Sequence, residues 1–159
     1  MYLKESTRRL RAEVDRAHRR GYIFAGKLVR GAYMTYERAE AKRKGVEDPI
    51  LDSIQETHRS YDEAVEFILS KIRAGQNDHV MLATHNLSSV QKAVRALPRS
   101  SIQNVETVQN SRAPSIRCFL CILSQVYFAQ LYGMKDHITF ALGAKGFQAF
   151  KYLNILLSI

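Results

Sequence analysis

Two short apolar runs in the sequence each end in side chains that could bind an anionic ligand. In residues 27–33, an apolar pair separates Lys27 from Arg30, and the small residues Gly31 and Ala32 follow. Two fixed positive charges beside a backbone with little side-chain bulk suit a flat, phosphate-bearing cofactor, because the main chain can approach it closely. The simpler alternative is that both cations are surface residues at the end of a strand.

The second run, residues 80–86, ends in Thr84, His85 and Asn86. It offers a hydroxyl, an imidazole and an amide at a point where a helix is expected to begin. The free N–H groups of a helix amino terminus attract anions. A capping turn with an incidental histidine is the alternative. No second histidine or carboxylate stands nearby at metal-ligand spacing, so we predict no metal site here.

Alternating helical and strand patterns surround these two runs. The patterns predict helices over residues 6–20, 35–45, 53–75, 86–97 and 134–144, and strands over residues 26–30, 79–84, 126–130 and 147–153. Such alternation indicates parallel strands joined by right-handed crossovers. The carboxyl ends of these strands lie together in a barrel, so we expect residues 27–33 and 80–86 to contribute to one site.

The fold class predicted from this order is α/β, as a partial (βα)8 TIM-like barrel. A closed eight-stranded barrel takes about 250 residues. The 159 residues supply about four parallel strands with intervening helices, and we expect the barrel to be incomplete at both ends. A doubly wound open sheet fits the same order, but it would usually carry a glycine-rich phosphate loop after its first strand.

Several helices have candidate capping residues at their amino termini, and Asn86 or Ser88 is expected to cap the helix over residues 86–97. Ser6 or Thr7 is expected to cap the first helix, and Thr35 the second. Asp52 or Ser53 is expected to cap the third. Each of these side chains can accept a hydrogen bond from a free N–H group of the first turn, which is why such residues favour this position.

The helix over residues 53–75 has the clearest apolar stripe in the sequence. The stripe is expected to pack on the sheet, and its members are Ile54, His58, Tyr61, Val65, Ile68 and Ile72. We interpret His58 as a hydrogen-bonded core residue rather than a ligand. The strand over residues 79–84 is continuously apolar, which predicts a strand covered on both faces.

The chain is strongly basic, with a formal net charge of +9 and a pI near 9.8. Such a balance attracts acidic partners. The positive charges are concentrated in residues 8–20 and 42–44, without interleaved aromatic residues for stacking on bases. A solvated helix face is therefore favoured over a polyanion-binding surface, and we expect no nucleic-acid partner.

The remaining sequence features have structural interpretations. Cys118 and Cys121 stand in an apolar run and are interpreted as inert packing residues, with a redox or half-zinc site as the alternative. Two thiols favour a reducing compartment. Residues 100–125 are interpreted as an atypical insert, since residues 100–114 lose all periodicity. The longest apolar runs fall short of the roughly 20 residues that span a bilayer.

Several segments together resemble the catalytic barrel of proline dehydrogenases. They are residues 27–33, 47–49, 80–86 and 128–134, and Tyr152. The eukaryotic mitochondrial type, with its hydroxyproline-oxidising relative, is the most similar. This resemblance implies that residues 1–159 form part of a distorted α/β barrel that holds FAD and oxidises L-proline to pyrroline-5-carboxylate.

The family resemblance also implies roles for individual residues. Lys27 matches a basic residue beside flavin N5, where a cation favours the electron-rich reduced flavin, and it is the catalytic residue implied. Further FAD contacts are implied at Arg30, Gly31, Ala32, Thr84 and His85. Walls of the substrate pocket are implied at Tyr33, Leu131 and Tyr152. No metal is implied.

The same resemblance suggests partners and a location. A hydride passes from proline to flavin N5 and the electrons pass to a membrane quinone. The implied location is the matrix side of the mitochondrial inner membrane, with peripheral association. L-proline and hydroxyproline are both candidate substrates. Family barrel strands and a paired substrate-binding arginine have no counterpart in the 159 residues, so a fragment or splice variant is expected. The alternative function is a truncated, non-catalytic barrel remnant that associates with the full-length enzyme.

Overall fold

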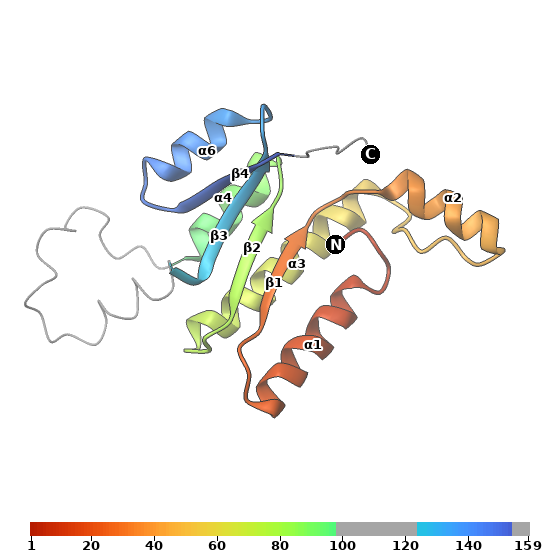
Figure 1. Ribbon diagram of the computed structural model, residues 1–159, viewed down its shortest axis with the longest axis horizontal. Helices are drawn as coiled ribbons and strands as arrows, with labels where there is room; N and C mark the ends of the chain where they lie inside the picture. Colours follow the sequence, from red (N-terminus) through yellow and green to blue (C-terminus); the bar gives the residue numbers. More distant parts are fainter. Residues whose placement is uncertain (98–123, 154–159) are drawn as a thin grey trace, which may run out of the picture.

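A single sheet of four parallel strands, in the order β1-β2-β3-β4, organises the molecule in a computed structural model that describes residues 1–97 and 124–153 (Figure 1). The strands are β1 (Ala25–Val29), β2 (His79–Ala83), β3 (Val126–Leu131) and β4 (Gln148–Tyr152). The helices of the described residues are α1 (Ser6–Arg20), α2 (Met34–Lys44), α3 (Ile54–Arg73), α4 (Leu87–Ala96) and α6 (Asp136–Gly143). The predicted α/β class with four parallel strands is confirmed.

One face of the sheet packs against helices. Figure 1 shows α3 and α4 behind the sheet, and α1 alongside β1. The sheet residues that join the core with α3, α4 and α6 are Leu28, Val80, Leu82, Val126 and Phe128. All are nearly inaccessible to solvent. Their positions alternate along the strands, as expected when every second side chain points to one face.

The other face of the sheet carries Lys27, Met81 and Tyr127, which are neighbours in the strand register. Met81 is only half-buried and lines a cavity. The prediction that residues 79–84 are covered on both faces is therefore wrong for the described part of the chain. A continuous apolar strand does not distinguish packing against a helix from packing around a cavity, because both environments accept apolar side chains.

Helix α3 has the strongest sequence signals and matches its prediction closely. The Ser53 hydroxyl accepts a hydrogen bond from the Glu56 N–H (3.1 Å), and the Glu56 carboxylate accepts one from the Ser53 N–H (3.1 Å). These reciprocal bonds form a capping box. Ile54 departs from the predicted stripe and is 64% exposed. It lies in the first turn, which lines the cavity instead of packing on the sheet.

The expected caps of α1 and α2 are wrong. Glu5 is the N-cap of α1, without a side-chain hydrogen bond, and the Thr7 hydroxyl instead lies 3.3 Å from the Ser60 hydroxyl of α3. Tyr33 is the N-cap of α2, and its left-handed backbone (φ 39°) turns the chain from β1 into the helix ahead of Thr35. Tertiary contacts and a sharp turn therefore override local capping preference at both positions.

Two predictions fall largely on residues outside the described ranges. Cys118 and Cys121 lie there, as does the proposed insert up to residue 123. Gln125, at the end of that segment, is buried and donates a hydrogen bond to the Gln76 carbonyl (2.9 Å). Among the described residues, no helix is long and apolar enough to cross a membrane.

Candidate functional site

A cavity of about 1260 Å³ lies at the carboxyl ends of the strands. The ends of all four strands and the first turns of α2 and α3 contribute to it. Every site residue predicted from the sequence lines this cavity: Lys27, Arg30, Gly31, Ala32, Tyr33, Thr84, His85, Leu131 and Tyr152. The structure thus brings the two apolar runs into one site, although the role of each residue stays a prediction.

Lys27 projects over the open face of the sheet towards Tyr152. Its ammonium nitrogen lies 3.8 Å from the centroid of the Tyr152 ring, which is the geometry of a cation–π contact. None of the ion pairs of the described residues includes Lys27. The charge is therefore not neutralised by a carboxylate in direct contact, and it remains available to a ligand in the cavity.

Arg30 lies one residue beyond β1 and reaches towards the helices. Its guanidinium donates to the Ser89 hydroxyl of α4 and contacts Nδ1 of His58 on α3. The guanidinium carbon is also 5.8 Å from the centroid of the Tyr61 ring. Burial lowers the pKa of Arg30, while Asp62 and Tyr61 act in the opposite direction. His58 is thus hydrogen-bonded, as predicted, but it is only half-buried and lines the cavity, so its placement in the core was wrong.

Gly31, Ala32 and Tyr33 form the turn between β1 and α2. A Cβ atom added to Gly31 would meet only the Met34 sulfur, at 3.7 Å, which is ordinary contact. Gly31 therefore adds no side chain to this part of the cavity wall, although no close contact requires a glycine at this position. Tyr33 is 77% exposed at the rim, where its ring is free to contact a ligand.

Residues 84–86 connect β2, the strand adjacent to β1, to α4, and we call this connection the Thr84–Asn86 corner. The Thr84 hydroxyl accepts a hydrogen bond from the Asn86 N–H (3.1 Å), and the Asn86 side chain caps α4 by accepting from the Ser89 N–H (3.0 Å). Nε2 of His85 accepts from the Leu131 N–H (3.0 Å). Burial lowers the pKa of His85, and the nearby Lys151 and Lys135 lower it further. The imidazole is therefore held neutral against β3.

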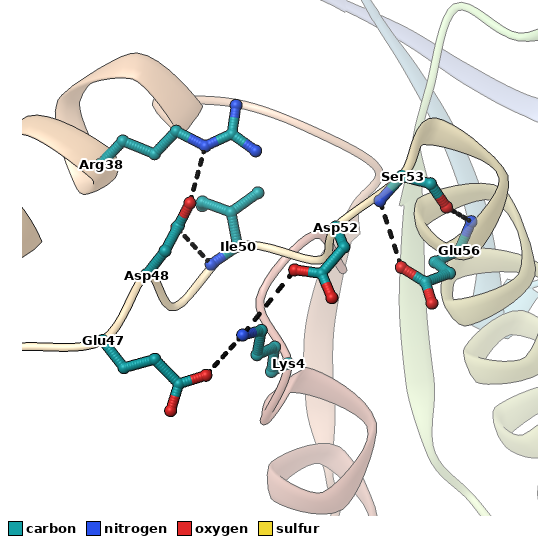
Figure 2. Close-up of polar contacts among 8 residues, drawn as sticks. All are labelled: Lys4, Arg38, Glu47, Asp48, Ile50, Asp52, Ser53 and Glu56. Carbon is teal, nitrogen blue, oxygen red and sulfur yellow. Dashed lines mark hydrogen bonds and ion pairs between the residues drawn. The ribbon is translucent and has the colours of Figure 1, made fainter.

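A set of polar contacts holds residues 47–53, which lie between α2 and α3 and form one wall of the cavity (Figure 2). Asp48 accepts from the Arg38 side chain (3.0 Å) and from the Ile50 N–H (2.9 Å). Lys4 pairs with Glu47 (2.6 Å) and lies 3.8 Å from Asp52. The segment that contains the 47–49 motif is thereby tied to the amino-terminal residues ahead of α1 and to α2, and it leads to the capped start of α3.

Comparison with known proteins identifies the family. A family model described as Proline dehydrogenase matches residues 1–155. The chain belongs to the proline dehydrogenase family. It is 38% identical over 154 residues to proline dehydrogenase 1, mitochondrial, of Caenorhabditis elegans, covering 96% of this chain and 22% of that protein. It is 37% identical over 150 residues to human hydroxyproline dehydrogenase, covering 94% of this chain and 29% of that protein.

Solved structures of this family show the same fold. Proline utilization A from Bdellovibrio bacteriovorus superposes with a TM-score of 0.72 at 22% sequence identity, covering 95% of this chain and 14% of that one. A second proline utilization A structure, with proline bound in remote sites, gives a TM-score of 0.69 at 18% identity. The chain thus spans about a quarter of the curated relatives it matches and a smaller share of these structures.

Some residues around this cavity were not predicted from the sequence. Gln130 is buried within β3, where it accepts a hydrogen bond from the Thr139 hydroxyl (2.7 Å) and donates to the Thr84 carbonyl (3.4 Å). It thereby braces the Thr84–Asn86 corner. One indication of this role was available in the sequence, which is a single amide side chain in an otherwise apolar strand. Ser89 and Asp62, which support Arg30, gave no signal, because their positions resemble ordinary polar helix residues.

The residues present fit an anionic, planar cofactor such as FAD. Cofactor pockets usually measure about 300–1,000 Å³, and this cavity is somewhat larger. Lys27 and Arg30 bring positive charge to it without a carboxylate in direct contact among the described residues, and Gly31 leaves the backbone accessible. No group of three or more metal-binding side chains occurs in residues 1–97 and 124–153. His137 is exposed on α6.

Proposed function

We propose that the chain takes part in the FAD-dependent oxidation of L-proline to pyrroline-5-carboxylate. The observation that carries the proposal is that Lys27, Arg30 and His85, from the ends of two adjacent strands, line one cavity. Membership of the proline dehydrogenase family supports the same reaction. When bound, FAD supplies the acceptor for the hydride that leaves the proline ring.

The proposed roles of the chain's residues follow from their positions. Lys27 places a positive charge over the open face of the sheet, where it would stabilise negative charge on a bound cofactor. Arg30 would hold an anionic part of the cofactor, and the backbone at Gly31 and Ala32 would pass close to it. Thr84 and His85 would contact the cofactor from β2, with His85 uncharged.

Tyr33, Leu131 and Tyr152 would form the substrate wall around the proline ring. They place aromatic and aliphatic surface on the cavity, which suits a small, mostly apolar ring. L-proline is the proposed substrate, and hydroxyproline is the second candidate because one relative is named hydroxyproline dehydrogenase. A quinone acceptor and a place on the matrix side of the mitochondrial inner membrane complete the proposal, supported by relatives that are named mitochondrial.

Binding of FAD to the purified chain provides the test. We expect weak binding and slow proline-dependent dye reduction, because the chain spans only 22% of the relative with 38% identity. Lys27→Met and Arg30→Met should each weaken FAD binding, whereas Lys145→Met, which removes an exposed lysine that does not line the cavity, should not. Failure to bind FAD, or equal effects of all three substitutions, would count against the proposed function.

A non-catalytic remnant is the second candidate function. Within the described sheet, β1 and β4 each pair on one side only. Such unpaired edges present hydrogen-bonding groups to other chains. Co-expression with a full-length family member, followed by affinity purification, distinguishes the two candidates. Stable association without any FAD binding by the purified chain would favour the remnant.

A further inference from the structure

The direct partners of Arg30 leave its charge unbalanced. The Ser89 hydroxyl is neutral, and Nδ1 of His58 accepts a hydrogen bond only in an uncharged imidazole. No aspartate or glutamate of the described residues forms an ion pair with this guanidinium. A partly buried cation held only by neutral groups is oriented by the protein and remains able to bind an anion.

Ser89 is held in turn by Asp62 of α3. Its hydroxyl donates to Oδ1 of Asp62 (2.7 Å), while the Lys92 ammonium pairs with Oδ2 of the same carboxylate. A serine hydroxyl has one proton and two lone pairs. Because that proton is committed to Asp62, a lone pair of the buried Ser89 oxygen is left to accept from Arg30. The carboxylate therefore determines which way the hydroxyl faces.

Arg30, Ser89 and Asp62 form a hydrogen-bonded relay that connects three separate elements. Arg30 follows β1, Asp62 lies in the third turn of α3, and Ser89 lies in the first turn of α4. The Ser89 N–H also donates to the Asn86 side chain, which ties the relay to the end of β2. A direct carboxylate contact would have neutralised Arg30, whereas a contact through a hydroxyl orients the guanidinium and leaves its charge available.

We propose that Asp62, acting through Ser89, is a positioning residue that orients the Arg30 guanidinium for an anionic group of the cofactor. His58 supports the second nitrogen of the same guanidinium. This inference rests on the proposed function, in that FAD is the anionic cofactor considered. It adds that Asp62 controls FAD binding although it does not line the cavity.

The first experiment compares FAD with riboflavin, which carries the same ring system without phosphates. In flavin fluorescence titrations of the chain, Asp62→Asn and Ser89→Ala should weaken FAD binding by about 3- to 30-fold and leave riboflavin binding unchanged. Glu66→Gln is the matched control, because Glu66 lies one turn along α3 and borders the same small pocket as Asp62. It should leave the affinity for both ligands unchanged.

A double-mutant cycle tests whether Asp62 acts through Arg30. In an Arg30→Met background, Asp62→Asn should have no further effect on FAD affinity. Three results would overturn the inference while leaving the proposed function intact: an unchanged effect in that background, equal weakening of FAD and riboflavin binding, or an equal effect of Glu66→Gln.

A cofactor-free readout separates this inference from the proposed function. The Nη–H signal of the Arg30 guanidinium in side-chain NMR spectra should be protected from solvent exchange in the wild-type chain and in Glu66→Gln, because these nitrogens contact Ser89 and His58. It should lose that protection in Asp62→Asn and Ser89→Ala. If the wild-type chain bound no flavin, the proposed function would fail and this signal would decide the positioning role. An unaltered signal in Asp62→Asn and Ser89→Ala would overturn the positioning role of Asp62.

Discussion

The ammonium nitrogen of Lys27 lies 3.8 Å from the centroid of the Tyr152 ring, although β2 and β3 separate their strands. Adjacent strands lie about 4.8 Å apart, so β1 and β4 of a flat sheet would be about 14 Å apart. The two long side chains meet because they point to the same open face of the sheet, which curves around that face. This contact is local evidence for the arc of a barrel.

The charge of Lys27 should matter more than its size. Lys27→Met removes the cation and should lower the reduction potential of bound FAD, because reduced flavin gains negative charge that a nearby cation stabilises. Lys27→Arg keeps the charge and should preserve the potential more closely. Potentiometric titration of the FAD-loaded protein measures the effect. Equal potentials in the wild type and Lys27→Met would exclude a tuning role for this lysine.

Acid should destabilise the fold through His85. Burial lowers the pKa of this imidazole in the folded chain, whereas an unfolded histidine titrates near about pH 6.5. As the pH falls below that value, the unfolded state takes up a proton more readily than the folded state, so stability decreases. Protonation would also break the bond that the Leu131 N–H donates to Nε2.

Thermal unfolding as a function of pH tests the role of His85. We expect the wild-type Tm to fall below about pH 6.5, and the Tm of His85→Gln to fall less steeply over the same interval. His137→Gln is the control, because His137 is exposed on α6. Identical pH profiles for the wild type and His85→Gln would contradict the prediction.

The Tyr61 hydroxyl should contribute nothing to stability. Tyr61 is 1% exposed, and its oxygen is the only buried side-chain polar atom of the described residues that has no hydrogen-bond partner. An unsatisfied buried polar group costs about 1–3 kcal/mol. Tyr61→Phe should therefore be neutral or raise the free energy of unfolding by up to about 1 kcal/mol in urea denaturation.

Tyr127→Phe serves as the comparison for Tyr61→Phe. The Tyr127 hydroxyl lies 3.3 Å from Nδ1 of His79, so this substitution removes an existing hydrogen bond. It should lower the free energy of unfolding by about 0.5–1.5 kcal/mol. A larger loss for Tyr61→Phe than for Tyr127→Phe would show that the Tyr61 hydroxyl has a stabilising partner.

The sequence predicted the elements of this fold more successfully than their contacts. The period of α3 and the apolar run of β2 are properties of consecutive residues, so they could be identified directly. The strand ends at Arg30 and His85 could be assigned to one site because parallel strands place their carboxyl ends together. Caps were less predictable, since the Thr7 hydroxyl contacts Ser60 instead of its own helix.

The support of Arg30 could not have been predicted in this way. Arg30, Asp62 and Ser89 are 27 to 59 residues apart, and the two helical residues occupy ordinary polar positions. Only the packing of α3 against α4 beside the end of β1 brings them together. Local patterns carry no information about such contacts, because each helix would look the same if its polar face were solvated.

A buried carboxylate at the opposite end of the sheet should be important for stability. Asp78, directly before β2, is 1% exposed, and its carboxylate accepts from the Phe24 N–H (3.4 Å) and lies 2.9 Å from Nε2 of His18 at the end of α1. His18→Ala would leave this carboxylate without its main partner. We expect a loss of about 1–3 kcal/mol in the free energy of unfolding. Asp15→Ala, on the exposed side of the same helix, should change it by less than about 0.5 kcal/mol. Equal losses in urea denaturation would show that His18 does not stabilise the fold through Asp78.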